Sequence, residues 1–247
     1  MTNIEQLKEK IKARWKEIDK NKENQHSIHC NICKTEIIIN KTKKYFSNCM
    51  FGGGILERYQ CPKCGVIFGP LKMMNLTNNE FDNEYIEHYK IYKTKDHSST
   101  EIKTFMHLNP NKKNTYINFG SGSLSTTVIK LRKMKYKVFG YEPYADTIKS
   151  NIIISNEDKI NSLTISGIFS NNLIEHFRDP VKSFKYMKTI LQPGSYMVHS
   201  TPCYNYSFDF TRFHLFFFTN DSIQFLCKQA GIKTYKKIDN KTCIFGV

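Results

Sequence analysis

Four of the eight cysteines form two Cys-x-x-Cys pairs, Cys30 with Cys33 and Cys61 with Cys64. Residues 34–60, 27 positions in all, separate the pairs, and the second pair, CPKCG, carries the Pro and Gly that are typical of a zinc knuckle. Four thiolates around one Zn²⁺ form a closed tetrahedral site, which is structural rather than catalytic. In a reducing compartment, paired cysteines indicate metal binding rather than disulfides. We therefore predict a structural zinc site.

Other readings of these cysteines are weaker. His26, His29 and Cys49 are rival ligands, but they lack the paired spacing. A redox role is disfavoured because neither pair opens a helix after a strand. The gap is longer than in compact zinc ribbons, and a loop inserted at residues 40–56 would explain it.

A second pattern indicates nucleotide binding. Residues 115–143 read as a strand, a glycine turn, a helix, a second strand and an acid. Gly120 and Gly122 allow a sharp turn and close approach of a ligand. Glu142 follows Gly122 by 20 positions, where a carboxylate holds ribose hydroxyls in dinucleotide-binding folds. Ser125 stands where a dinucleotide fingerprint has its third glycine, so a dehydrogenase is disfavoured and S-adenosylmethionine is the alternative.

Roughly residues 115–235 resemble the class I S-adenosylmethionine-dependent methyltransferases. The resemblance rests on NFGSGS at 118–123, GYEPYA at 140–145, and a later stretch with Glu175-His176, Asp179-Pro180 and the LQPG of 191–194. The segment RFHLFFFTNDSIQFLCKQAGIK at 212–233 is also similar to the segment after the family's last motif strand. This resemblance implies an enzyme with a Rossmann-like, doubly wound α/β sheet and S-adenosylmethionine as cofactor.

The resemblance also implies a set of cofactor-binding residues, with Asn156 as the candidate for the adenine contact. The set is Asn118, Gly120, Ser121, Gly122, Glu142, Pro143, Asn156 and Asn171. Two positions depart from the family pattern: Asn118 replaces an acid that helps hold the methionine amino group, and Leu124 replaces a glycine. These departures leave open a degenerate binding protein without catalysis.

The whole layout is similar to that of zinc-containing methyltransferases that act on sugars, through CPKCGVIFGP and the Tyr-rich segment after it. The sugar C-methyltransferases carry a further C-terminal domain, for which this chain ends too soon, so O-methylation is favoured. Small enzymes of this kind decorate bacterial surface polysaccharides and methylate phosphoramidate groups. The resemblance therefore implies a small anionic or sugar-containing acceptor, with a hydroxyl or phosphoramidate group in capsular polysaccharide biosynthesis as the candidate.

Acceptor residues are expected on loops at the carboxyl ends of strands. One loop carries Glu175 and His176, and the other is TPCYNYSFDFTRFHLFFF at 201–218. A hydroxyl acceptor needs a general base within hydrogen-bond reach, whereas an anionic acceptor needs none. The predicted catalytic residues are His214, the first choice for a base, His176 and Tyr206; the predicted acceptor-binding residues are Tyr204, Arg212 and Glu175. Alternatively, Glu175 could only stabilise the N-terminus of a helix electrostatically, and His176 could only cap that helix or pack at its start.

Four parts of the chain must position these residues. They are an amphipathic helix in 1–25, a zinc-binding module at 26–76, a helical connection at 77–110 and a methyltransferase domain at 111–247. Alternating strands and helices after residue 115 predict a mostly parallel sheet that is covered on both faces. The first helix is expected to pack on the chain, and a homodimer formed through it is the alternative.

The composition limits the classes of substrate and partner that are expected. The net charge of +15 suits an anionic substrate, but the lysines are scattered. An RNA methyltransferase that grips nucleic acid with its zinc module is the rival hypothesis; it is disfavoured because aromatic and basic residues are not interleaved there. No segment is long and apolar enough to span a membrane, and the start lacks a signal-peptide core. We expect a cytoplasmic protein without a membrane span.

Overall fold

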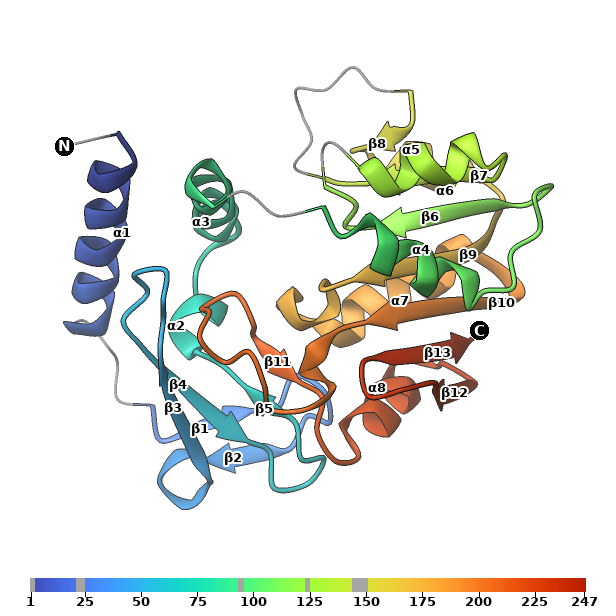
Figure 1. Cartoon of the computed structure of the whole chain (residues 1–247). Coiled ribbons are helices and arrows are strands. Elements are labelled where there is room, and N and C mark those ends of the chain that lie inside the picture. The colour runs from blue at the N-terminus through green and yellow to red at the C-terminus, as the bar shows by residue number, and fades with distance from the viewer. Residues whose placement is uncertain (1–2, 21–24, 93–95, 123–124, 144–150) are drawn as a thin grey trace. The chain divides into compact units, whose positions relative to one another are not determined.

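The computed structural model describes residues 3–20, 25–92, 96–122, 125–143 and 151–247 (Figure 1). The chain divides into two compact units. The first comprises Met1–Thr94, Glu175–Arg178 and Cys203–Phe225, and the second comprises Lys95–Ile174, Asp179–Pro202 and Leu226–Val247. Two short segments within the predicted 111–247 domain thus belong to the first unit. The four-part division of the sequence stays a prediction.

The helices of the first unit are α1 (Asn3–Lys20), α2 (Leu71–Met74) and α3 (Asn78–Ile91). The predicted helix of residues 3–20 is confirmed, and Ile11 and Trp15 from its apolar stripe are buried. The packing expected of that stripe is therefore observed. Helix α3 begins with a capping box, in which Thr77 and Glu80 satisfy each other's backbone N–H groups.

Two small antiparallel sheets complete this unit. Strand β1 (Ser27–His29) pairs with β2 (Glu36–Ile38). The other sheet has the order β11-β5-β4-β3, and its strands are β3 (Lys44–Asn48), β4 (Ile55–Gln60), β5 (Ile67–Phe68) and β11 (Phe216–Phe217). The loop expected at residues 40–56 is therefore wrong in part. A short 3₁₀ helix at Ile39–Lys41 overlaps the start of this loop, and strand β3 lies within it. Strand β3 has no clean alternation of buried and exposed residues that could predict a strand.

The second unit is built on a seven-stranded sheet of order β12-β13-β10-β9-β6-β7-β8. Its strands are β6 (Thr115–Phe119), β7 (Lys137–Tyr141), β8 (Ile153–Ile154), β9 (Ile165–Asn171), β10 (Leu191–Ser200), β12 (Thr234–Lys237) and β13 (Thr242–Gly246). Strands β10, β9, β6, β7 and β8 are parallel, whereas β13 runs antiparallel to both of its neighbours. The predicted mostly parallel α/β sheet is confirmed.

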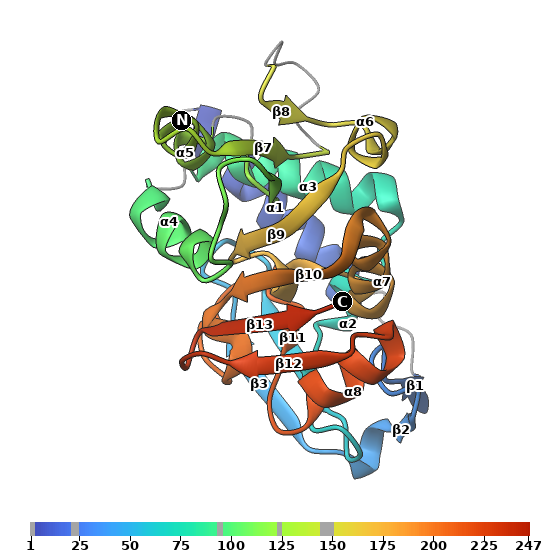
Figure 2. The ribbon, with the colours of Figure 1, turned by 90° about the vertical axis from the view of Figure 1, so that its right-hand side faces the viewer.

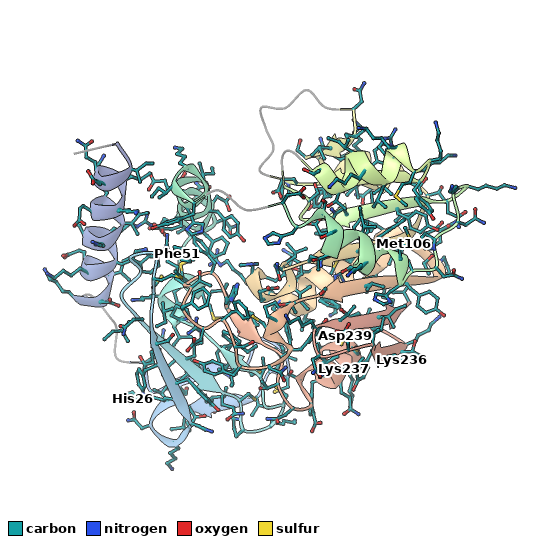
Figure 3. All side chains as sticks on the ribbon, viewed as in Figure 1. His26, Phe51, Met106, Lys236, Lys237 and Asp239 are labelled. Carbon is teal, nitrogen blue, oxygen red and sulfur yellow. The ribbon has the colours of Figure 1, made fainter. Side chains whose placement is uncertain are left out.

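Helices cover both faces of this sheet, as Figure 2 shows for α4 and α5 on one face and α6 and α7 on the other. Their bounds are α4 (Ser98–Met106), α5 (Thr126–Lys133), α6 (Glu157–Asn161) and α7 (Pro180–Ile190), and α8 spans Ser222–Ala230. Side chains of Ser125 and Asp179 cap the first turns of α5 and α7. Met106, labelled in Figure 3, packs against a buried cluster that includes Phe105 and Phe169. This core holds β6 and β9 in place.

None of the helices in the described part of the chain has the length and hydropathy needed to cross a bilayer.

Candidate functional site

The glycine turn and Glu142 meet at the ends of two neighbouring parallel strands, β6 and β7. The backbone N–H of Gly120 donates to the Tyr141 carbonyl at 2.8 Å, which ties the turn to the end of β7. The backbone N–H of Gly122 donates to the Glu142 Oε2 at 3.1 Å. The two halves of the predicted nucleotide motif are thus in direct contact.

Both glycines adopt backbone angles that favour glycine. Gly120 has φ of +72°, and a Cβ there would lie 2.5 Å from Leu173 Cδ1. Gly122 has φ of +68°, and no atom of the described residues lies within 4 Å of where its Cβ would be. Gly120 therefore permits close packing of the turn, and both glycines adopt a conformation that other residues rarely adopt.

This turn lies at the switch point of the sheet. From β6 the chain continues outward to β7 and β8, whereas β9, the other neighbour of β6, is followed by β10 in the opposite direction. Ligands of open α/β sheets bind at such a point, outside the carboxyl ends of the strands. Asn171, at the end of β9, belongs to the same edge of the sheet. The predicted cofactor residues Ser121 and Pro143 follow β6 and β7 at this edge.

A carboxylate that no sequence motif predicts lies beside Asn118. The Asn118 side chain is almost fully buried, and its Nδ2 donates to Glu101 Oε2, on α4, at 3.1 Å. Glu101 precedes β6, so no motif within the strand, turn and helix could indicate it. Asn118 itself carries no carboxylate, but Glu101 on α4 places a carboxylate next to it.

The two other predicted asparagines have local structural contacts. Asn171 Nδ2 donates to Thr104 Oγ1 at 3.0 Å, which connects the end of β9 to α4. Asn156 is the N-cap of α6, and its Oδ1 accepts from the Asp158 N–H at 2.7 Å. The Nδ2 group of Asn156 takes no part in this cap. Leu124, the departure at the third family glycine, lies outside the described residues.

The four paired cysteines of the first unit converge. The Sγ atoms of Cys30 and Cys64 lie 3.7 Å apart, and those of Cys33 and Cys61 lie 3.4 Å apart. All four side chains are buried, and together they could hold one metal ion. Hydrogen bonds among these thiols lower the pKa of Cys61 and raise the pKa of Cys30 and of Cys64, so in the absence of a metal the thiolate form is favoured at Cys61 alone of these three.

Both Cys-x-x-Cys turns have the same backbone geometry. In the first, Cys30 N–H donates to Thr35 O at 2.9 Å and Lys34 N–H to Cys30 O at 2.9 Å. In the second, the equivalent bonds join Cys61 N–H to Val66 O at 2.9 Å and Gly65 N–H to Cys61 O at 3.0 Å.

The residue after each second cysteine, Lys34 or Gly65, has positive φ. Two matching knuckles that face one another fit a tetrahedral Cys₄ zinc site. Within the described residues, the group of four does not include the rival ligands His26, His29 and Cys49.

A second polar cluster forms in the first unit around the predicted catalytic histidines. The rings of His176 and His214 have centroids 5.0 Å apart. Glu175 is buried, and it forms a group with Cys203 and His214 whose ligand atoms lie within 4.8 Å of one another. Cys203 was not predicted as a site residue, because its spacing from Glu175 and His214 in the sequence matches no metal-ligand pattern.

Hydrogen bonds fix the tautomers of both histidines. His176 Nδ1 donates to Phe213 O at 2.9 Å, and His214 Nδ1 donates to Phe208 O at 2.8 Å. Each ring then carries its lone pair on Nε2. Burial lowers the pKa of His214 to about 4, so this ring is neutral near pH 7. Both rings can accept a proton or bind a metal.

The predicted tyrosines have different environments. Tyr204 is buried and packs near Phe218, with ring centroids 6.2 Å apart. Tyr206 is partly exposed and lies between Tyr45 and Phe217, at centroid distances of 4.6 and 4.8 Å. Burial raises the pKa of Tyr206, so its hydroxyl stays protonated near pH 7.

Arg212 is held inside the first unit by a buried counter-ion. Its side chain is fully buried, and its Nη2 lies 3.1 Å from Glu84 Oε2. Glu84 also accepts from Trp15 Nε1 at 3.2 Å and pairs with Arg14 at 2.8 Å. Arg212 Nη1 donates to the carbonyl of Phe51, labelled in Figure 3, at 3.1 Å. These contacts give Arg212 a structural role, and the acceptor clamp predicted from the sequence stays a prediction.

Replacing Glu84 with Gln is expected to destabilise the protein by about 3 kcal/mol, because it leaves the buried Arg212 charge without its counter-ion. Chemical denaturation followed by circular dichroism measures this change. Glu9→Gln is the control, since Glu9 pairs with Lys12 on the surface and such pairs contribute about 0–1 kcal/mol. Equal effects of the two substitutions would contradict the structural role of the buried pair.

Comparisons with known proteins agree with this architecture. A family model described as a methyltransferase domain matches residues 92–236, more than half of the 247 residues. A solved structure of the 1,6-didemethyltoxoflavin-N1-methyltransferase of Burkholderia thailandensis, with 1,6-didemethyltoxoflavin and S-adenosylhomocysteine bound, superposes with a TM-score of 0.50 at 9% identity. The match covers 83% of this chain and 97% of that one.

A SAM-dependent methyltransferase from Archaeoglobus fulgidus is also similar, with a TM-score of 0.48 and 12% identity over 66% of this chain and 99% of that one. A comparison with curated protein sequences finds no match. At 9% identity the Burkholderia structure supports the Rossmann-like fold alone, and the family match carries the activity. The chain belongs to the methyltransferase domain family and is a methyltransferase.

Proposed function

We propose that this methyltransferase transfers a methyl group from S-adenosylmethionine to a small acceptor. The observation that carries the proposal is the contact between Gly122 N–H and Glu142 Oε2 at the switch point of the sheet. S-adenosylhomocysteine bound to the Burkholderia enzyme of the same fold supports this cofactor. The carboxylate of Glu142 would accept from the ribose hydroxyls, and the turn at Gly120–Gly122 would let the cofactor approach the backbone.

Glu101 would hold the ammonium group of the methionine part of the cofactor. Its carboxylate is positioned by Asn118, which donates to Oε2 and leaves Oε1 for the ligand. A carboxylate that accepts from an ammonium forms a charge-assisted hydrogen bond, stronger than a neutral one. In this role Asn118 orients the acid instead of replacing it.

Glu101→Gln is expected to weaken S-adenosylhomocysteine binding about ten- to a hundredfold, the value of one hydrogen bond to a charged group. Adding Asn118→Asp to this variant returns a carboxylate to the same place and should recover part of the affinity. Isothermal titration of the three proteins measures the effect. An unchanged dissociation constant in the single variant would exclude Glu101 from the cofactor site.

The four-cysteine group would hold a structural zinc ion. Four buried thiols in two matching knuckles fit a closed tetrahedral site, which has no position left for a substrate. When bound, zinc would supply folding free energy to the first unit rather than chemistry.

The acceptor is proposed to be small and anionic or sugar-containing. The net charge of +15 supports an anionic acceptor. Methyl transfer to oxygen is favoured, with a hydroxyl or phosphoramidate group of a capsular polysaccharide precursor as the candidate. For a hydroxyl acceptor, the pair of His176 and His214 would supply the general base, with Tyr206, Tyr204 and Glu175 as proposed partners; an anionic acceptor would need no base.

The test is methyl transfer from S-adenosylmethionine labelled in its methyl group, with sugar phosphates, phosphoramidate-bearing sugars and RNA as acceptors. The proposal predicts label in a small-molecule acceptor and not in RNA. Transfer to RNA, with binding that weakens steeply as salt rises, would replace the proposal with the RNA methyltransferase hypothesis. Cofactor binding with no turnover on any acceptor or cell extract would favour a non-catalytic binding protein.

A further inference from the structure

A group of three ligand-type side chains lies in the first unit, outside the Cys₄ group. Glu175 and Cys203 are fully buried, His214 is half-buried, and their ligand atoms lie within 4.8 Å of one another. The Cys203 Sγ is 3.5 Å from His214 Nδ1. Glu175 and Cys203 belong to separate 3₁₀ helices, Ile174–His176 and Pro202–Tyr204, and His214 precedes β11. Three remote segments therefore bring an oxygen, a sulfur and a nitrogen donor to one place.

Backbone hydrogen bonds fix these three segments relative to each other. Leu215 N–H donates to the Glu175 carbonyl at 2.8 Å, and Phe218 N–H donates to the Cys203 carbonyl at 2.7 Å. The Phe208 carbonyl accepts from His214 Nδ1 at 2.8 Å. Nδ1 is also the ring nitrogen that lies 3.5 Å from Cys203 Sγ, so a metal bound beside Cys203 through Nδ1 would replace both the Nδ1 proton and the contact with the Phe208 carbonyl.

We propose that Glu175, Cys203 and His214 bind a second metal ion of the zinc class. Carboxylate, thiolate and imidazole are the three donor types that Zn²⁺ accepts, with bonds of about 2.0–2.3 Å. Such bonds place tetrahedral ligands about 3.3–3.8 Å apart, so the observed spread of up to 4.8 Å closes with side-chain shifts of about 1 Å.

The number of protein ligands distinguishes this site from the Cys₄ group. A site with three ligands keeps one coordination position for water or another ligand, as in catalytic zinc sites, whereas the Cys₄ site is closed. An oxygen of an anionic or hydroxyl ligand is the group that would take this position. With His214 bound to the metal, His176 is the imidazole of the pair that stays available to accept a proton.

Packing alone is the competing explanation for Cys203. Its side chain also contacts a small apolar cluster with Ile67 and Phe217, and a buried thiol is common in protein cores. Apolar packing does not account for a carboxylate and an imidazole within reach of the same sulfur. The two explanations predict different metal contents, so they can be separated by experiment.

The experiment measures zinc by mass spectrometry in protein that was loaded with zinc and then dialysed against metal-free buffer with a weak chelator. The wild type is expected to retain a second zinc equivalent beyond that of the Cys₄ group. Cys203→Ser and His214→Asn should each lose that equivalent and keep the first. Cys227→Ser, a buried thiol outside both groups, is the matched control and should retain both.

A wild-type protein with a single equivalent, or variants that retain both, would overturn the proposal. Loss of both ions would show that a variant is misfolded; cobalt substitution of the wild type then decides. Addition of Co²⁺ after the Cys₄ group is filled should produce a further thiolate-to-cobalt absorption band, and the absence of this band would also overturn the proposal. Neither measurement needs a cofactor, so the proposal of a second metal site is tested independently of S-adenosylmethionine binding.

Discussion

Replacing Glu142 with Ala is expected to weaken binding of S-adenosylhomocysteine by a hundredfold or more while the protein stays folded. The carboxylate is positioned by Gly122 N–H at 3.1 Å and lies at the carboxyl end of β7. In the proposed complex it accepts hydrogen bonds from two ribose hydroxyls. Hydrogen bonds to a charged group contribute about 1.5–3 kcal/mol each, so two of them correspond to about two to four orders of magnitude in affinity.

Glu142→Gln is the graded control for this prediction. Its side-chain oxygen can still accept from Gly122 N–H, but the amide offers one acceptor atom where the carboxylate offers two. Its affinity should therefore lie between those of the wild type and the alanine variant. Isothermal titration and circular dichroism on the same samples separate lost binding from lost folding. Wild-type affinity in Glu142→Ala would remove this residue from the cofactor site.

Replacing Cys61 with Ser is expected to remove zinc and unfold the β1–β2 and β3–β5 region. The Cys61 thiol is buried and lies 3.4 Å from the Cys33 thiol within the four-cysteine group. Structural zinc contributes about 10–16 kcal/mol of apparent binding free energy in small zinc modules. The net free energy of unfolding of most proteins is only about 5–15 kcal/mol, so losing the ion can remove all of the stability of such a module. The strands there are two to six residues long, so the proposed zinc ion would contribute much of the stability of this region.

Zinc analysis together with limited proteolysis tests this outcome. The expected result is loss of an equivalent of zinc and rapid cleavage between residues 25 and 70. Cys243→Ser serves as the control, because Cys243 is a buried thiol on β13 in the second unit. A Cys61→Ser protein with full zinc content and unchanged resistance to protease would contradict a structural metal at this site.

The sheet of the second unit was largely predictable because its strands carry strong local signals. Each central strand is a short apolar run followed by a glycine, an acid or an asparagine, as at β6 and β9. The outer strand β12 was not predicted, because all four residues of TYKK are exposed and follow no period. Strand β13 pairs with β12 and β10 through backbone hydrogen bonds, and such pairing leaves little trace in a sequence.

In the candidate sites, too, contacts within a local pattern were predictable, and contacts that depend on tertiary packing were not. The contact between Gly122 and Glu142 follows from one strand–turn–helix–strand unit, and the cysteine pairs follow from their spacing. Glu101 beside Asn118 depends on how α4 packs on the sheet, which no local pattern records. The ion pair of Arg212 with Glu84 joins residues 128 positions apart, so a basic side chain near a predicted loop could not be distinguished from a buried structural one.

The central claim, that this chain uses S-adenosylmethionine, is tested most directly by calorimetric titration of the zinc-replete wild-type protein with S-adenosylhomocysteine. The account predicts saturable binding of a single molecule per chain. Absence of binding by protein whose circular dichroism and zinc content show that it is folded would contradict the proposed cofactor site at Gly120–Gly122 and Glu142.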